Sequence, residues 1–182
     1  MKMKIGINPG HDTGGHVGAV NPAKGVDEGH IVLQIGILLQ EILQQKGHEV
    51  VFIQQDNLRG EAPYFNYKDS VVGFLNAQHT DVNISLHCNA WQGADEDAEG
   101  TETFYYSTNE KGLALAADIQ TELVRLGFAN RGVKHGDGQS FVRDTTATSV
   151  LVEIGFIRNS HDVNLLLNHQ KEIAEAIARA IK

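Results

Sequence analysis

The chain has 182 residues, 41% of them hydrophobic and 21% charged, which is the composition of a globular protein large enough to bury a core. Its net charge of −8, with no basic stretch, argues against a nucleic-acid or anionic-membrane partner. A single cysteine, Cys88, excludes an internal disulfide, and no apolar run is long enough to predict a transmembrane helix.

The first half of the chain alternates apolar stretches of strand length with amphipathic stretches of helix length. Glycines and prolines mark the boundaries between them, and Gly47 is placed to end the first long helix. In chain order we expect a strand over 4–8, a glycine-rich loop over 10–18, a helix over 27–47, a strand over 50–53, helical spacing within 61–79 and a strand over 82–86 that ends at His87.

The second half continues the same alternation. Its expected elements are a loop over 92–100, a β-rich segment over 101–106, a helix over 109–126, a strand over 150–154 and a C-terminal helix within 161–181. Strands that alternate with long helices predict a single α/β domain over 1–182, with a twisted, mostly parallel sheet flanked by helices on both faces. Functional sites in such domains gather beyond the carboxyl ends of the strands.

Two histidines fall where such a site is expected, and a glutamate at the start of a helix could reach toward it. His11 follows the first strand and His87 ends a later one, so either imidazole could bind a metal, although a lone histidine is more often structural. Glu28 opens the first long helix, where it could serve the helix dipole or provide an oxygen ligand, and Asp27 could start the helix instead. Cys88 is a metal ligand by type, but a buried small hydrophobe is the favoured interpretation.

Glu153 is the strongest anomaly in the sequence. It stands inside the apolar segment Ser149 to Phe156, where a carboxylate is costly to bury unless it is paired or bound to something. Burial raises the pKa of a glutamate toward the range of a general base. Two histidines, a glutamate ligand and a second glutamate beside them are typical of a hydrolytic zinc site. The glycines that follow His11, namely Gly14, Gly15 and Gly18, match no phosphate-binding fingerprint, so a nucleotide-binding domain is a weak alternative.

Four motifs in order resemble those of the zinc-dependent N-acetylmuramoyl-L-alanine amidases, the autolysin and phage-lysin type of cell-wall enzyme. They are Asn8-Pro9-Gly10-His11, Glu28 before an amphipathic helix, Ser85-Leu86-His87-Cys88-Asn89, and Leu151-Val152-Glu153-Ile154-Gly155-Phe156. The resemblance extends to Arg131-Gly132-Val133-Lys134 and to Ile157-Arg158-Asn159 with Asp162, and so covers nearly the whole chain. It departs from the family at Asp12-Thr13, at Cys88 and over 57–68.

The resemblance implies one Zn²⁺ ion held by His11, Glu28 and His87, with Glu153 essential for catalysis. It further implies cleavage of the amide between muramic acid and L-alanine in peptidoglycan, with Glu153 as general base. Asn89, beside His87, is a candidate for contact with the substrate. Because Cys88 replaces the usual alanine without disturbing the ligands, the departures bear on specificity more than on activity.

Other functions share parts of this pattern. A zinc peptidase or deacetylase acting on the same polymer would use the same metal ligands. A wall-binding module that has lost catalysis is a further alternative, and the intact set of His11, Glu28, His87 and Glu153 argues against it. We expect a monomer that acts on the cell wall, without membrane insertion. The start of the chain does not resemble a signal peptide, so we expect an excised domain or export of the phage-lysin kind.

Overall fold

A six-stranded sheet in the order β4-β1-β5-β8-β6-β7 forms the centre of the molecule. In the computed structural model, which describes residues 1–60, 66–91 and 98–182, four neighbouring pairs are parallel and only β6 and β8 are antiparallel. The strands are β1 (Lys4–Pro9), β4 (Glu49–Phe52), β5 (Val82–Asn89), β6 (Thr101–Tyr105), β7 (Asn130–His135) and β8 (Thr148–Phe156). A short hairpin of β2 (Val20–Asn21) and β3 (Val26–Asp27) stands apart from this sheet.

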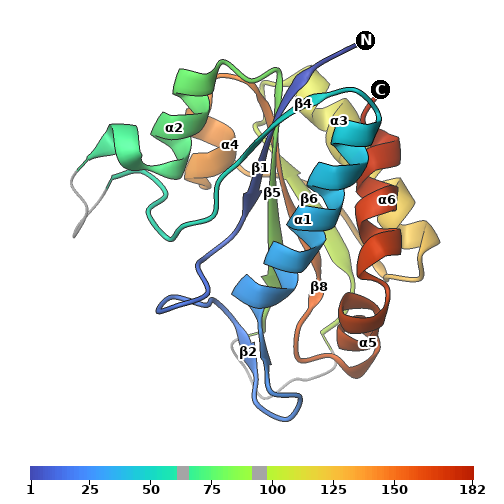
Figure 1. Ribbon diagram of the computed structural model, residues 1–182. Coiled ribbons are helices and arrows are strands. Elements are labelled where there is room, and N and C mark those ends of the chain that lie inside the picture. Colours follow the sequence, from blue (N-terminus) through green and yellow to red (C-terminus); the bar gives the residue numbers. More distant parts are fainter. Residues whose placement is uncertain (61–65, 92–97) are drawn as a thin grey trace.

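Helices cover both faces of the sheet, as predicted (Figure 1). On one face lie α1, α3 and α6, with α6 in contact with both α1 and α3, and on the other face lie α2 and α4. The helices are α1 (Glu28–Gln45), the short 3-10 helix η1 (Tyr67–Asp69), α2 (Val71–Gln78), α3 (Glu110–Arg125), α4 (Ser140–Asp144), α5 (Ser160–Asn168) and α6 (Gln170–Ala180). None of the helices among the described residues combines the length and apolar character needed to cross a membrane.

The first long helix, α1, shows why the predicted pattern folds as it does. Asp27 caps its start, because the carboxylate of Asp27 accepts the backbone N–H of His30 at 3.0 Å. Its apolar stripe, which includes Ile35 and Leu39, is fully buried against the sheet, and each such side chain contributes roughly 1.5–3 kcal/mol to stability. The helix ends before Gly47, which has a φ of +90° that few other residues adopt.

The two faces of the strands differ in chemistry. Alternate residues of β1, β5 and β8, such as Ile7, Leu86 and Val152, form the main core with α1, α3 and α6. The residues between them, including His87 and Glu153, point to the face of α2 and α4. Helices α2 and α4 pack on this face in a separate small cluster.

Several elements differ from the expected ones, and the hairpin β2–β3 and the short helix α4 are additions to them. The segment 130–135 is an edge strand that was not predicted, and the C-terminal helix is two helices divided at His169. Helix α2 occupies only the end of the stretch 61–79. Residues 61–65 of that stretch, and 92–97 of the expected loop 92–100, lie outside the described residues.

Candidate metal centre and cleft

His11 stands just beyond β1, in a loop held tightly against β5. The backbone N–H of Gly10 donates to the carbonyl of Leu86 at 2.8 Å. A Cβ atom at Gly10 would lie 2.2 Å from the His87 ring, so only glycine lets the two segments approach this closely. His11 itself has a φ of 61°, a left-handed conformation that is uncommon outside glycine and often marks functional sites. The sequence therefore places the His11 ring edge-on to His87, with 5.1 Å between the centroids.

Glu28, the first residue of α1, contacts both histidines through its carboxylate. Its Oε1 atom is 2.9 Å from Nδ1 of His87 and its Oε2 atom is 3.3 Å from Nε2 of His11. The backbone N–H groups of Ala19 and Cys88 also donate to this carboxylate, at 2.9 and 3.0 Å. Burial alone would raise the pKa of Glu28, but the hydrogen bonds with His11 and His87 outweigh it and hold the pKa below its usual range. Glu28 is therefore a buried carboxylate in its ionised form.

These three residues form a group that could hold a metal ion. One ligand atom from each of His11, Glu28 and His87 lies within 4.8 Å of the others. Two imidazole nitrogens and one carboxylate oxygen are a donor set that catalytic zinc sites use. The hydrogen bond with Glu28 also raises the pKa of His11, so a proton competes with a metal for the imidazole of His11. The donor set and its convergence fit the predicted metal centre.

Glu153 lies on β8 directly opposite His87 on β5. Its Oε2 atom is buried and has no hydrogen-bond partner among the described residues. Burial raises the pKa of Glu153 to about 7, with the nearby histidines opposing the change and Glu28 adding to it. A carboxyl group that changes its charge near neutral pH suits a general base.

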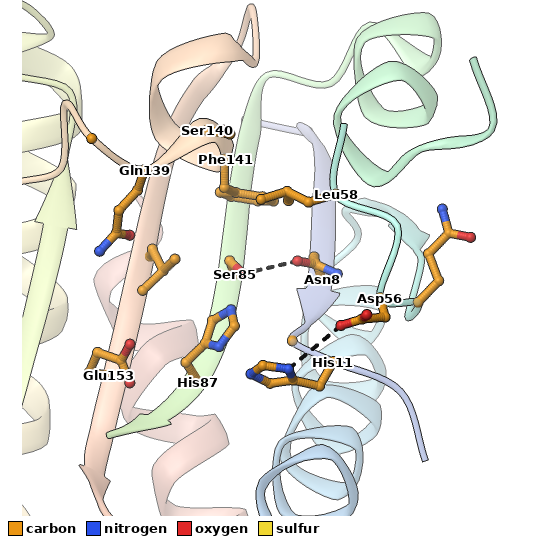
Figure 2. Close-up of a pocket in the computed structure, with 14 residues that line it drawn as sticks. Asn8, His11, Asp56, Leu58, Ser85, His87, Gln139, Ser140, Phe141 and Glu153 are labelled. Carbon is orange, nitrogen blue, oxygen red and sulfur yellow. Dashed lines mark hydrogen bonds and ion pairs between the residues drawn. The ribbon is translucent and has the colours of Figure 1, made fainter. Parts of the chain in front are cut away.

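One cleft joins these groups. It has a volume of about 380 Å³ and is lined by His11 and His87 on one side and by Glu153 on the other (Figure 2). Apolar side chains from the α2 and α4 side, Leu58 and Phe141, close its upper part. Such a mixture of apolar walls and a few convergent polar groups is typical of a substrate site.

Asp56 and Gln139 are among the cleft-lining residues that the sequence motifs do not indicate. Asp56, four residues after β4, has Oδ1 3.8 Å from Nδ1 of His11 and Oδ2 3.6 Å from Nδ1 of His16. The rule that sites gather beyond strand ends would have indicated Asp56. Gln139 enters from the loop before α4, and no local pattern points to it.

Asn89 has a structural contact in addition to its predicted role. Its side-chain amide donates to Glu102 at 2.7 Å, and Glu102 also accepts from Arg131 at 3.0 Å and from Lys134. Glu102 faces Glu153 across the antiparallel pair of β6 and β8, so this charged cluster adjoins the cleft. Contact of Asn89 with substrate stays a prediction. Cys88 is buried in the main core, which confirms its interpretation as a small hydrophobe.

The pKa of Glu153 predicts a pH-dependent stability. Because the native state keeps a proton that the unfolded chain loses between pH 4.5 and about 7, the free energy of unfolding falls as pH rises through this window. Residue 153 does not titrate in the Glu153→Gln variant. Between pH 4 and 8 the free energy of unfolding of the metal-free wild type should therefore fall by about 2 to 3 kcal/mol more than that of this variant. Urea unfolding of both proteins at pH 4 and pH 8 measures the two free energies. If their difference is the same at both pH values, the pKa of the Glu153 carboxyl is not raised in the folded protein.

Comparison with known proteins gives a consistent result. Residues 5–182 match the model of a family described as N-acetylmuramoyl-L-alanine amidase. An uncharacterized cell wall amidase of Bacillus anthracis is 32% identical over 96% of this chain, and the match spans only 34% of that longer protein. The germination-specific N-acetylmuramoyl-L-alanine amidase of Bacillus subtilis is 26% identical over 97% of this chain and 77% of its own length.

Solved structures resemble the whole fold. The N-acetylmuramoyl-L-alanine amidase AmiC2 of Nostoc punctiforme has a TM-score of 0.83 and 27% identity, covering 100% of this chain and 96% of its own. The catalytic domain of the CD27L endolysin, which targets Clostridia difficile, has a TM-score of 0.82 and 26% identity, covering 98% and 96%.

Proposed function

Because the chain belongs to the N-acetylmuramoyl-L-alanine amidase family, we propose that it hydrolyses the amide between muramic acid and L-alanine with zinc bound by His11, Glu28 and His87. The observation that supports the proposal most directly is the convergence of these three side chains, two of which, His11 and His87, line a cleft whose opposite wall carries Glu153. Peptidoglycan is the substrate, and the cell wall is the place of action. One amidase domain over 1–182 is part of the same proposal.

The three ligands have separate tasks. His11 presents its imidazole from the loop just after β1, and His87 presents its imidazole from near the end of the adjacent parallel strand β5. Glu28 contacts both rings and so fixes their orientation. When bound, zinc would polarise the lactyl carbonyl and lower the pKa of a water molecule. Asp56, near the other nitrogen of His11, is placed to orient that ring.

Glu153 performs the proton transfers. Its carboxylate would take a proton from the water as the water oxygen bonds to the lactyl carbonyl carbon. It would then give that proton to the nitrogen of L-alanine as the carbon–nitrogen bond breaks. The products are a free lactyl carboxyl group on muramic acid and a peptide that begins with L-alanine. The apolar side chains Leu58 and Phe141 limit the access of bulk water to this wall.

Digestion of purified peptidoglycan, followed by mass spectrometry of the new ends, tests the proposal. We expect peptides with free L-alanine amino groups, and we expect a chelator to stop their release and added zinc to restore it. Cleavage at another bond would indicate a peptidase or deacetylase with the same metal ligands. Tight binding of the folded, zinc-supplied protein without cleavage would indicate a wall-binding module and contradict the proposed reaction.

A further inference from the structure

Two unpaired oxygen atoms face the same cleft. Among the described residues, the buried side-chain oxygens without a hydrogen-bond partner are Oε1 of Gln139, Oε2 of Glu153 and Oδ1 of Asp162. Gln139 and Glu153 both line the cleft. A buried polar atom without a partner lowers stability, so each such atom requires an explanation. The proposed reaction explains Glu153 and leaves Gln139 without a role.

The backbone around Gln139 is fixed before any ligand arrives. Its N–H donates to the carbonyl of Gly136 at 2.8 Å, and its own carbonyl accepts from Arg143 at 3.1 Å. Gly136 in turn donates to Tyr105 at 2.7 Å, and a Cβ atom there would lie 2.8 Å from Val142. This tight packing anchors the loop to β6 and α4.

The side chain of Gln139 has no part in that anchoring. Gln139 occupies the N-cap position of α4, yet its carboxamide makes no capping hydrogen bond. Figure 2 shows the side chain extending into the cleft on the side of Glu153, away from His11 and Asp56. The apolar side chains Leu151 and Phe141 line the same cleft. An apolar wall strengthens a hydrogen bond made there and makes an unused carboxamide more costly.

We propose that Gln139 is a substrate-positioning residue whose carboxamide hydrogen-bonds an amide group of the stem peptide on the leaving side of the scissile bond. The assignment rests on the proposed function. In that reaction Glu153 gives its proton to the L-alanine nitrogen, so the peptide must lie against the wall that Glu153 and Gln139 share. A neutral carboxamide, which both accepts and donates, matches a peptide amide better than it matches a carboxylate or an ammonium group.

Binding of an N-acetylmuramoyl-L-alanyl peptide tests this directly. Calorimetry should compare two zinc-supplied proteins, the Glu153→Gln variant and the double variant that also carries Gln139→Met. The Glu153→Gln change in both proteins keeps the peptide from being consumed. Methionine keeps the length of the side chain and removes both polar atoms. We expect the Kd to rise about tenfold, the effect of one lost hydrogen bond in a buried site. The Tm of the metal-free protein should stay the same or rise, because an unpaired buried oxygen is removed.

Gln120 provides the matched control. It is buried and fully paired, since its Oε1 accepts from Thr103 at 3.0 Å and its Nε2 donates to Thr101 and Asn130 at 2.8 Å each. Gln120→Met should therefore lower the Tm and leave the Kd unchanged, which is the signature of a structural glutamine.

The outcomes separate this assignment from the proposed function. If Gln139→Met leaves the Kd unchanged, the assignment is wrong whatever the Tm does, while wild-type release of L-alanine peptides would still support the amidase. If the wild type releases no such peptides, the proposed reaction fails and the assignment of the leaving peptide to Gln139 fails with it.

Discussion

Glu153→Gln is expected to reduce hydrolysis of peptidoglycan by about 10³-fold while the protein keeps its fold and its zinc. The amide of glutamine has nearly the shape of the carboxyl group but cannot take a proton from water at neutral pH. Because Glu153 lies outside the group formed by His11, Glu28 and His87, metal content should not change. Release of L-alanine peptides, zinc per chain and Tm are the three measurements.

Glu102→Gln is the matched control for that variant. Glu102 lies directly opposite Glu153 in the antiparallel pair of strands, so it occupies the same face of the sheet. Its carboxylate is paired with Arg131 and Lys134, and these ion pairs lower its pKa against the effect of burial. We expect Glu102→Gln to lower stability by about 1–3 kcal/mol and to keep hydrolysis. Near-normal activity of Glu153→Gln, or equal losses in both variants, would contradict the role of Glu153 as general base.

His87→Ala is expected to abolish zinc binding and to lower hydrolysis to the level of chelator-treated wild type. Glu28 is less informative as a target, because it also accepts backbone N–H groups of Ala19 and Cys88 and so supports the loop around it. His87 contacts Glu28 through one hydrogen bond of 2.9 Å, and removing its ring takes away one of three ligands. Metal analysis after dialysis and the peptidoglycan assay measure the two effects.

His30→Ala controls for the general loss of a histidine near the site. His30 lies two residues after Glu28 on α1, is 58% exposed at its side chain and pairs with Asp27 at 2.8 Å. It should keep both zinc and activity. Full zinc occupancy in His87→Ala would remove His87 from the proposed ligand set, and loss of zinc in His30→Ala would show that the effect is not specific to the ligands.

Local patterns were enough to predict most of the fold and the proposed site. The apolar alternation of β5, the continuous apolar run of β8 and the helical stripe of α1 each reflect burial of that element, so they can be recognised within a single segment. The cap at Asp27 and the end at Gly47 are equally local. Because four strands of the sheet run in parallel, their carboxyl ends meet at one edge, and this topology explains why His11, His87 and Glu153 could be grouped in advance.

The missed elements lack such a local signal. Edge strand β7 carries Arg131 and Lys134 and is exposed or half-buried along its length, so it has no apolar alternation. The break between α5 and α6 falls at His169, where neither glycine nor proline marks a stop. The antiparallel direction of β6 is also absent from its own sequence, because pairing direction depends on the path of the chain between strands.

The sequence by itself therefore determined the strand and helix pattern, the family resemblance and the candidate ligands, since each depends on residue types within one segment. Only the tertiary structure decided which distant side chains share the cleft. It brought Asp56 to His11 and placed Gln139 on the wall of Glu153, and it turned Asn89 toward Glu102. The physical reason is that these contacts depend on how loops pack over the open end of the sheet, which no periodicity within a segment encodes.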